Sequence, residues 1–297
     1  MTDNAQTSPA AILATPIRRR SKMTRLWRNL RKAPLSAWFG LIVVTVYVIT
    51  AVLAPLLAPY SETELVGGAF EPWGGQFLLG TDQLGRDMLS RLIYGARNTV
   101  GIAFLTTMLS FLLGSALGLA AAISRGWIDQ ALSRSVDVLM SIPQLIFALV
   151  LLSILGPSVL NLIIIMAVLD STRVFRLSRS VAQGVVVMDY VEAARLRGEK
   201  LPWIMRREIL PNIMPPLVAE FGLRFCFVFL TISALSFLGL GIQPPTADWG
   251  SMVRDNAALI TYGDITPLLP AGAIALLTVS VNFVVDWFLH KTSGLRE

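Results

Sequence analysis

Long apolar runs limit what this chain can fold into more than any other feature of its sequence. A helix needs about 20 apolar residues to cross the roughly 30 Å hydrocarbon core of a bilayer. Inside that core a backbone must satisfy its own hydrogen bonds, as helices and closed barrels do. Six runs follow residue 36, at roughly 38–57, 99–123, 136–155, 158–178, 215–241 and 267–289. The pattern predicts an all-α polytopic membrane protein with six transmembrane helices.

The composition supports this interpretation and excludes several alternatives. Of the 297 residues, 54% are hydrophobic and only 15% are charged, whereas soluble domains carry about 25% charged residues. The net charge is +6, but the basic residues lie between apolar runs, so we expect membrane topology and no nucleic-acid partner to explain them. With one cysteine (Cys226) and one histidine (His290), we expect neither an enzyme nor a metal site.

The basic residues also predict the orientation. If the N-terminus lies inside the cell and the chain crosses six times, twenty lysines and arginines fall in inside segments and four in outside segments. Because cytosolic segments are enriched in Lys and Arg, both termini are predicted to be cytosolic. We therefore expect a cytosolic tail with an amphipathic segment, a transmembrane domain, one large cytosolic loop, two outside loops and a cytosolic C-terminal tail. Their ranges are 1–36, 37–290, 180–212, 58–98 with 242–265, and 291–297.

Four charged residues in or near the apolar runs are expected to form ion pairs. Asp170 and Arg173 lie one helical turn apart in the fourth run, and Glu220 and Arg224 lie one turn apart in the fifth. A charge at membrane depth costs about 2.5–3.5 kcal/mol, so pairing is favoured over contact with a transported solute. In the second run, small residues from Gly114 to Gly118 are typical of close helix packing.

The segment between the fourth and fifth runs, residues 189–212 (DYVEAARLRGEKLPWIMRREILPN), predicts two short helices with a break. Asp189 can cap the first helix, and Gly198 permits a turn without a Cβ clash. Pro202 suits the first turn of the second helix, which Pro211 is expected to end. On these features alone the segment could be a basic interfacial loop that holds two spans at the headgroups.

The same segment resembles the EAA loop of ABC importer permeases, which is Glu-Ala-Ala, three residues, a glycine, and a later Ile and Leu-Pro-Asn. The matching residues are Glu192, Ala193, Ala194, Gly198, Ile204, Leu210, Pro211 and Asn212. The resemblance implies that this helix–turn–helix docks into a cleft on a separate ATPase subunit, with small alanines for close approach and glycine for the turn. Glu208 stands where many relatives have histidine, which leaves the role of that side chain open.

Two further stretches resemble the dipeptide, oligopeptide and nickel importer permeases. Residues 79–99 read LGTDQLGRDMLSRLIYGARNT and residues 235–250 read LSFLGLGIQPPTADWG. Together with the arginines of 176–181, they indicate the second (C-type) permease of the pair that such importers use. The chain departs from the pattern at Ile232, where many relatives carry an acidic residue.

This resemblance implies a type I permease fold and inward transport of di- or oligopeptides across the bacterial inner membrane. The partners would be a homologous second permease, two ABC ATPase subunits with ATP and Mg²⁺, a substrate-binding protein and membrane lipid. No phosphate-binding loop motif occurs in the sequence, so this chain is not expected to hydrolyse ATP. Import of nickel or opine-type conjugates by the same machinery is an alternative, and an ion-gradient secondary transporter is a more distant one.

The outside loops offer candidate contacts for the binding protein. They are Asp82, Arg86, Asp87, Arg97 and Trp249. The alternative is a self-contained ion-pair network that holds the shape of the first loop. Asp87 and Arg91 stand at helical i,i+4 spacing, which favours that alternative for this pair.

Overall fold

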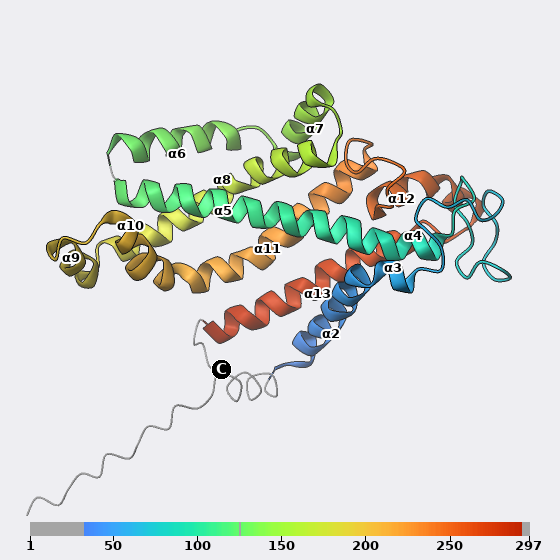
Figure 1. The fold of residues 1–297 in the computed structure, drawn as a ribbon, viewed down its shortest axis with the longest axis horizontal. Helices are drawn as coiled ribbons and strands as arrows, with labels where there is room; N and C mark the ends of the chain where they lie inside the picture. The colour runs from blue at the N-terminus through green and yellow to red at the C-terminus, as the bar shows by residue number, and fades with distance from the viewer. Residues whose placement is uncertain (1–32, 125, 293–297) are drawn as a thin grey trace, which may run out of the picture. The chain divides into compact units, whose positions relative to one another are not determined.

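The computed structural model describes residues 33–124 and 126–292, so the predicted N-terminal amphipathic segment and most of the C-terminal tail lie outside the described residues. The unit that begins at Leu35 is built from helices (Figure 1), and its described part contains no β-strand, only two isolated bridges. Its elements are α2 (Leu35–Val52), α3 (Ala54–Leu57), α4 (Met88–Gly95), η1 (Ala96–Val100), α5 (Gly101–Ser124), α6 (Trp127–Met140), α7 (Gln144–Leu155), α8 (Val159–Val186), α9 (Asp189–Leu196), α10 (Leu201–Ile204), η2 (Met205–Ile209), α11 (Leu210–Phe237), α12 (Trp249–Asn256), η3 (Ala257–Tyr262) and α13 (Leu268–Thr292).

Within the described residues, four continuous helical stretches are long and apolar enough to cross a membrane, and the bent pair of α6 and α7 makes a fifth if it is counted as one span. The four stretches are Leu35–Val52, Met88–Ser124, Leu201–Phe237 and Leu268–His290. Two of them are longer than the apolar runs suggest, because α4, η1 and α5 join into one stretch, as do α10, η2 and α11. Both joined stretches contain a five-residue π-helical turn, a feature that is frequent at functional sites.

The third and fourth predicted spans take unexpected forms. The run 136–155 is not one straight helix, because α6 and α7 are bent by 85° relative to each other. Pro143 occupies the N-cap of α7, and proline both lacks an N–H group and disfavours helical geometry in the residue before it. α8 is 28 residues long and carries four charged residues, Asp170, Arg173, Arg176 and Arg179, so it falls outside the apolar stretches. The count of six spans therefore stays a prediction.

The second helix of the 189–212 segment does not end at Pro211, so that prediction is wrong. Pro211 lies in the first turn of α11, which continues to Phe237 with Pro215 and Pro216 inside it. Pro211 follows directly on the π-helical turn Met205–Ile209 and lies inside the continuous stretch Leu201–Phe237. As a consequence, the segment leads directly into a long helix of the membrane domain.

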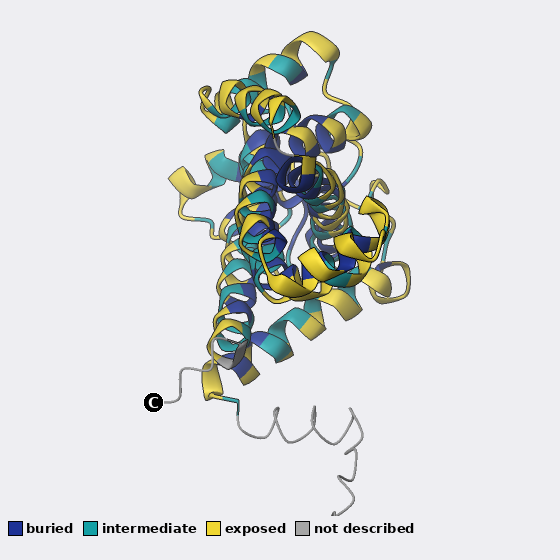
Figure 2. Ribbon diagram, turned by 90° about the vertical axis from the view of Figure 1, so that its left-hand side faces the viewer, coloured by how far each residue is buried: buried dark blue, intermediate teal, exposed yellow. Residues whose placement is uncertain are grey.

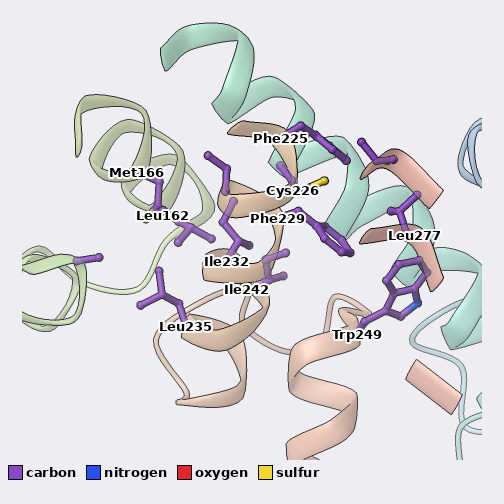
Figure 3. Close-up of a cluster of buried hydrophobic side chains, with 14 of the residues drawn as sticks. Leu162, Met166, Phe225, Cys226, Phe229, Ile232, Leu235, Ile242, Trp249 and Leu277 are labelled. Carbon is purple, nitrogen blue, oxygen red and sulfur yellow. The ribbon is translucent and has the colours of Figure 1, made fainter. Parts of the chain in front are cut away.

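Small residues let the long helices pack closely. A Cβ atom added at Gly114 would lie 2.5 Å from the carbonyl oxygen of Ser171, and one at Gly118 would lie 2.7 Å from that of Phe175. The predicted small-residue face of α5 therefore packs directly against the backbone of α8. Buried residues gather along the inner faces of the long helices (Figure 2), and a large apolar cluster joins α8 and α11 to Trp249 of α12 (Figure 3).

Candidate functional site

The segment from Asp189 to Asn212 lies at one end of the helical unit, and α12 with the loop that precedes α4 lies at the other (Figure 1). We call residues 189–212 the coupling segment, after the role that their sequence leads us to expect. It forms two short helices with a break between them, as predicted. The cap is different from the prediction, because Met188 occupies the N-cap of α9 without a side-chain hydrogen bond. Asp189 and Glu192 instead lie in the first turn, where negative charge is favoured by the helix dipole.

Gly198 makes the break between α9 and α10. Its φ angle is +81°, and the N–H of Glu199 donates to the carbonyl of Ala194 at 3.2 Å, as in the glycine-terminated helix ends called Schellman motifs. A Cβ added at Gly198 would meet nothing within 4 Å. Glycine is therefore needed here for its backbone conformation, and the space around it is free.

One face of the coupling segment is anchored to the long helices. Val191, Ala194, Ile204 and Ile209 are almost completely buried. They share an apolar cluster with residues of α5 and α8, among them Leu119, Ile123, Ala182 and Val186. Of the eight residues that resemble the EAA loop, Ala194 and Ile204 thus belong to this anchoring face.

The opposite face of the segment is exposed and partly apolar. Glu192, Ala193, Gly198, Pro211 and Asn212 are exposed, and Leu210 is half-buried. The amide of Asn212 donates to the carbonyl of Glu208 at 2.6 Å. Four large side chains that sequence reasoning did not single out are also exposed, namely Tyr190, Leu196, Leu201 and Trp203. These four residues lie off the anchoring face, and that position is the sequence signal that could have identified them. Exposed apolar groups of this kind are typical of a protein interface.

At the other end, Asp82 is the centre of a buried ion-pair network. Its carboxylate lies 2.7 Å from the guanidinium of Arg86 and 3.3 Å from that of Arg91. All three side chains are at most 4% exposed. The predicted network is present, but the partner of Arg91 is Asp82 and not Asp87. The carboxylate of Asp87 caps α4 and accepts hydrogen bonds from the N–H and hydroxyl of Ser90.

Trp249 is also buried, at 2% exposure. Its indole N–H donates to the carbonyl of Leu92 at 3.0 Å, and a Cβ added at Gly95 would lie 2.5 Å from its ring. The glycine of one sequence motif therefore makes room for the tryptophan of the other. Among the five candidate contacts at this end, Arg97 is the exposed one.

Glu62 joins the two long loops, and sequence reasoning missed it. Its carboxylate accepts from the amide of Asn98 at 2.9 Å and from the N–H of Ala247 at 2.7 Å. Its backbone carbonyl accepts from Arg91 at 3.0 Å. No sequence signal could have identified it, because the partners lie up to 185 residues away along the chain.

Asp248 completes the contact between the loops. It caps α12 by accepting from the N–H of Ser251, and it accepts from the hydroxyl of Thr99 at 2.9 Å. The side chain is fully buried. Burial raises the pKa of the Asp248 carboxyl above its ordinary value, although hydrogen bonds from its neighbours oppose that shift.

Replacing Asp248 with alanine should loosen α12 by about 1 kcal/mol through loss of the cap, whereas Asp248→Asn keeps an acceptor and should be tolerated. A raised folded-state pKa means that the contribution of this group to stability is present at low pH and is lost as pH rises through that pKa. Limited proteolysis of residues 242–265 across pH measures both effects. Equal damage by alanine and asparagine would contradict this assignment.

A second buried charge cluster lies between the long helices. Arg224 of α11 contacts Glu220 at 2.7 Å and Asp170 of α8 at 3.8 Å, and its guanidinium carbon lies 4.7 Å from the ring centroid of Phe227. Asp170 also accepts from the hydroxyl of Ser110 on α5 at 2.9 Å. The predicted Glu220–Arg224 pair is confirmed. Asp170, expected beside Arg173, pairs with Arg224 instead, and it thereby links three helices.

The fold and the two ends of the helical unit together define a class, a multi-pass α-helical membrane protein with an anchored helix–turn–helix at one end and an ion-paired loop assembly at the other. Among the residues that the structure describes, no group of three or more His, Cys, Asp or Glu side chains could hold a metal ion. The sequence pattern of the family described as "Binding-protein-dependent transport system inner membrane component" matches residues 110–292, and that of the "N-terminal TM domain of oligopeptide transport permease C" matches residues 21–69.

Curated relatives match most of the chain. The dipeptide transport system permease protein DppC of Alkalihalophilus pseudofirmus is 34% identical, over 91% of this chain and 87% of the relative. The di/tripeptide transport system permease protein DppC of Pseudomonas aeruginosa is 37% identical, over 87% and 85%. This chain belongs to the family of binding-protein-dependent transport system inner membrane components, the permease subunits of ABC importers.

Solved structures show the same fold. A chain of the MetNI methionine ABC transporter has a TM-score of 0.56 and 19% identity, and the match covers 67% of this chain and 94% of that one. A chain of an amino acid ABC transporter has a TM-score of 0.52 and 21% identity, and the match covers 68% and 94%. The fold is therefore the type I permease fold expected from the sequence.

Proposed function

We propose that this chain is the C-type permease of an ABC importer that carries di- and oligopeptides inward across the bacterial inner membrane. Two relatives that match most of the chain are named for dipeptide and di/tripeptide transport. The observation that carries the mechanism is the coupling segment, which is anchored on one face and exposes apolar groups on the other. A segment built in this way can transmit the motion of a partner to the long helices.

The proposed partner on the exposed face is an ABC ATPase subunit, one of two that hold ATP and Mg²⁺. Glu192, Ala193, Pro211 and Asn212 would contact it together with the exposed apolar groups. Gly198 would set the angle between α9 and α10. The basic residues near the segment support a cytosolic location for it, with both termini on the same side.

At the opposite end we propose contact with a substrate-binding protein, and a homologous second permease would complete the pore. Arg97 is exposed and available for such a contact. Asp82, Arg86, Asp87 and Trp249 are buried, so we propose that they support the contact surface from beneath. Their ion pairs and caps hold the loop in one shape, which lowers the entropy cost of docking.

Uptake of a labelled dipeptide into membrane vesicles should require ATP on the cytosolic side and should survive collapse of the ion gradients. The physical reason is that hydrolysis on the partner subunit, and not an ion gradient, drives the conformational change. The measurement is accumulated label with ATP, without ATP, and with a protonophore. Vesicles that contain this permease but lack the ATPase subunits are the control.

Two outcomes would contradict the proposal in different ways. Uptake that continues without the ATPase subunits would indicate a secondary transporter. Uptake of nickel chelates or opine-type conjugates, with no competition by unlabelled peptides, would keep the importer mechanism and replace the cargo.

A further inference from the structure

We infer that an apolar groove between α2, α11, α13 and the start of α5 binds an acyl chain of a membrane phospholipid. The groove has a volume of about 670 Å³, within the range of roughly 300–1,000 Å³ that is typical of ligand sites. The groove touches all four described helical stretches that are long and apolar enough to cross a membrane. It is lined by α2, α11, α13 and the start of α5. The inference does not depend on which solute the importer carries.

The chemistry of the lining selects an apolar occupant. Among the described residues that line the groove, none is charged. The hydroxyl of Tyr47 donates to the carbonyl of Ala273 at 3.0 Å, so this polar group is already satisfied. A buried water would need two to four polar partners, and a peptide would need partners for its backbone groups. A hydrocarbon chain needs neither.

Small residues on facing helices create the groove. At the floor, a Cβ on Gly222 of α11 would lie 2.2 Å from a methyl group of Val285 on α13, so these helices are in direct contact there. Nearer the surface, a Cβ on Gly101 would meet nothing within 4 Å, and this position faces the open volume. The groove is thus open at Gly101, while α11 and α13 are in contact at Gly222 and Val285.

The surroundings of the groove indicate that the bound acyl chain comes from a membrane lipid. The groove is continuous with the exposed apolar surface of the spans, because Val48 and Val52 of α2, Phe104 of α5 and Val218 of α11 line it while each remains at least 44% exposed. α2 and α13 are also the least buried of the four long apolar stretches. A lipid chain can therefore enter sideways from the bilayer.

The test uses the full-length chain, purified with its partner subunits and reconstituted with a phosphatidylglycerol that carries a diazirine in its acyl chain. After photolysis, mass spectrometry maps the labelled peptides. We compare the natural sequence with Gly101→Leu, which fills the groove, and with Gly272→Leu. Gly272 is an equally unobstructed exposed glycine on α13, but it does not line the groove. Leu112, exposed on α5 away from the groove, reports general lipid contact.

Labelling of the groove, relative to Leu112, should fall about tenfold in Gly101→Leu, the ratio expected if the added side chain displaces about two buried methylenes. It should be unchanged in Gly272→Leu. If Gly101→Leu fails to fold, Ala51→Phe closes the same groove from α2. Equal labelling in all variants, or groove labelling no higher than at Leu112, would overturn the inference. So would a photocrosslinker at Val48 that captures a second permease subunit instead of lipid.

Discussion

Replacing Gly198 with valine is expected to reduce ATP-driven uptake to near background while the chain still inserts into the membrane. An L-residue in the left-handed region costs about 1–2 kcal/mol, and the cost is larger for a β-branched side chain. An energy of that size lowers the population of the native turn by a factor of roughly 5–30. The φ of +81° at this position is what holds α9 and α10 at their angle, so docking to the ATPase should fail.

Gly184 provides the matched control for this prediction. It lies near the end of α8, and a Cβ there would also meet nothing within 4 Å, but its φ is in the ordinary helical region. Gly184→Val should therefore leave uptake close to normal. Peptide uptake and ATP hydrolysis by the reconstituted importer are measured for both variants. Normal coupled uptake by Gly198→Val would show that the turn does not position a docking surface.

Replacing Arg224 with leucine should destabilise the membrane domain by about 3–5 kcal/mol, the usual cost of removing one partner of a buried ion pair. Asp170, which is 1% exposed, would lose its ion pair with Arg224 and leave a buried carboxylate that neither lipid nor the protein core can solvate. Glu220 would lose its partner in the same step. The measurement is the temperature at which half of the protein in lipid nanodiscs loses its folded fluorescence signal.

The comparison variant is Arg176→Leu. Arg176 lies 3.2 Å from Asp137, but the two side chains are 60% and 44% exposed, and an exposed pair contributes at most about 1 kcal/mol. The double variant Arg224→Leu with Asp170→Asn should recover part of the lost stability, because it removes the unpaired charge. If Arg224→Leu were no worse than Arg176→Leu, the cluster would not be a structural link between helices.

Much of the candidate site was predictable because its signals are local. Two short helices and the break at Gly198 follow from the propensities of adjacent residues and a glycine. Ends of elements were less predictable. Pro211 is typical of a helix end, but in the structure the helical stretch Leu201–Phe237 continues through it. The hydropathy pattern did not indicate that the run around Pro143 would bend by 85°, since apolar residues can continue across a bend.

Partners across the fold could not be predicted from spacing. Arg91 stands four residues from Asp87, yet its ion pair is with Asp82. Asp170 stands three residues from Arg173, yet its partner is Arg224 on another helix. Trp249 belongs to a motif that suggested surface contact, but it is buried on Gly95. In each case sequence spacing did not identify the contact, because the tertiary packing determined which groups lie close enough to touch.

The sequence by itself determined that this chain is an α-helical membrane permease and where its coupling segment lies. Apolar run length, charge distribution and the motif residues from Glu192 to Asn212 are properties of composition and local order. Only the tertiary structure decided which of that segment's residues are buried against the long helices and which are exposed. Ala194 and Ile204 face the anchoring cluster with Leu119 and Val186, while Glu192 and Ala193 face outward. The physical reason is that a helix face acquires a role only when another element covers it or leaves it exposed.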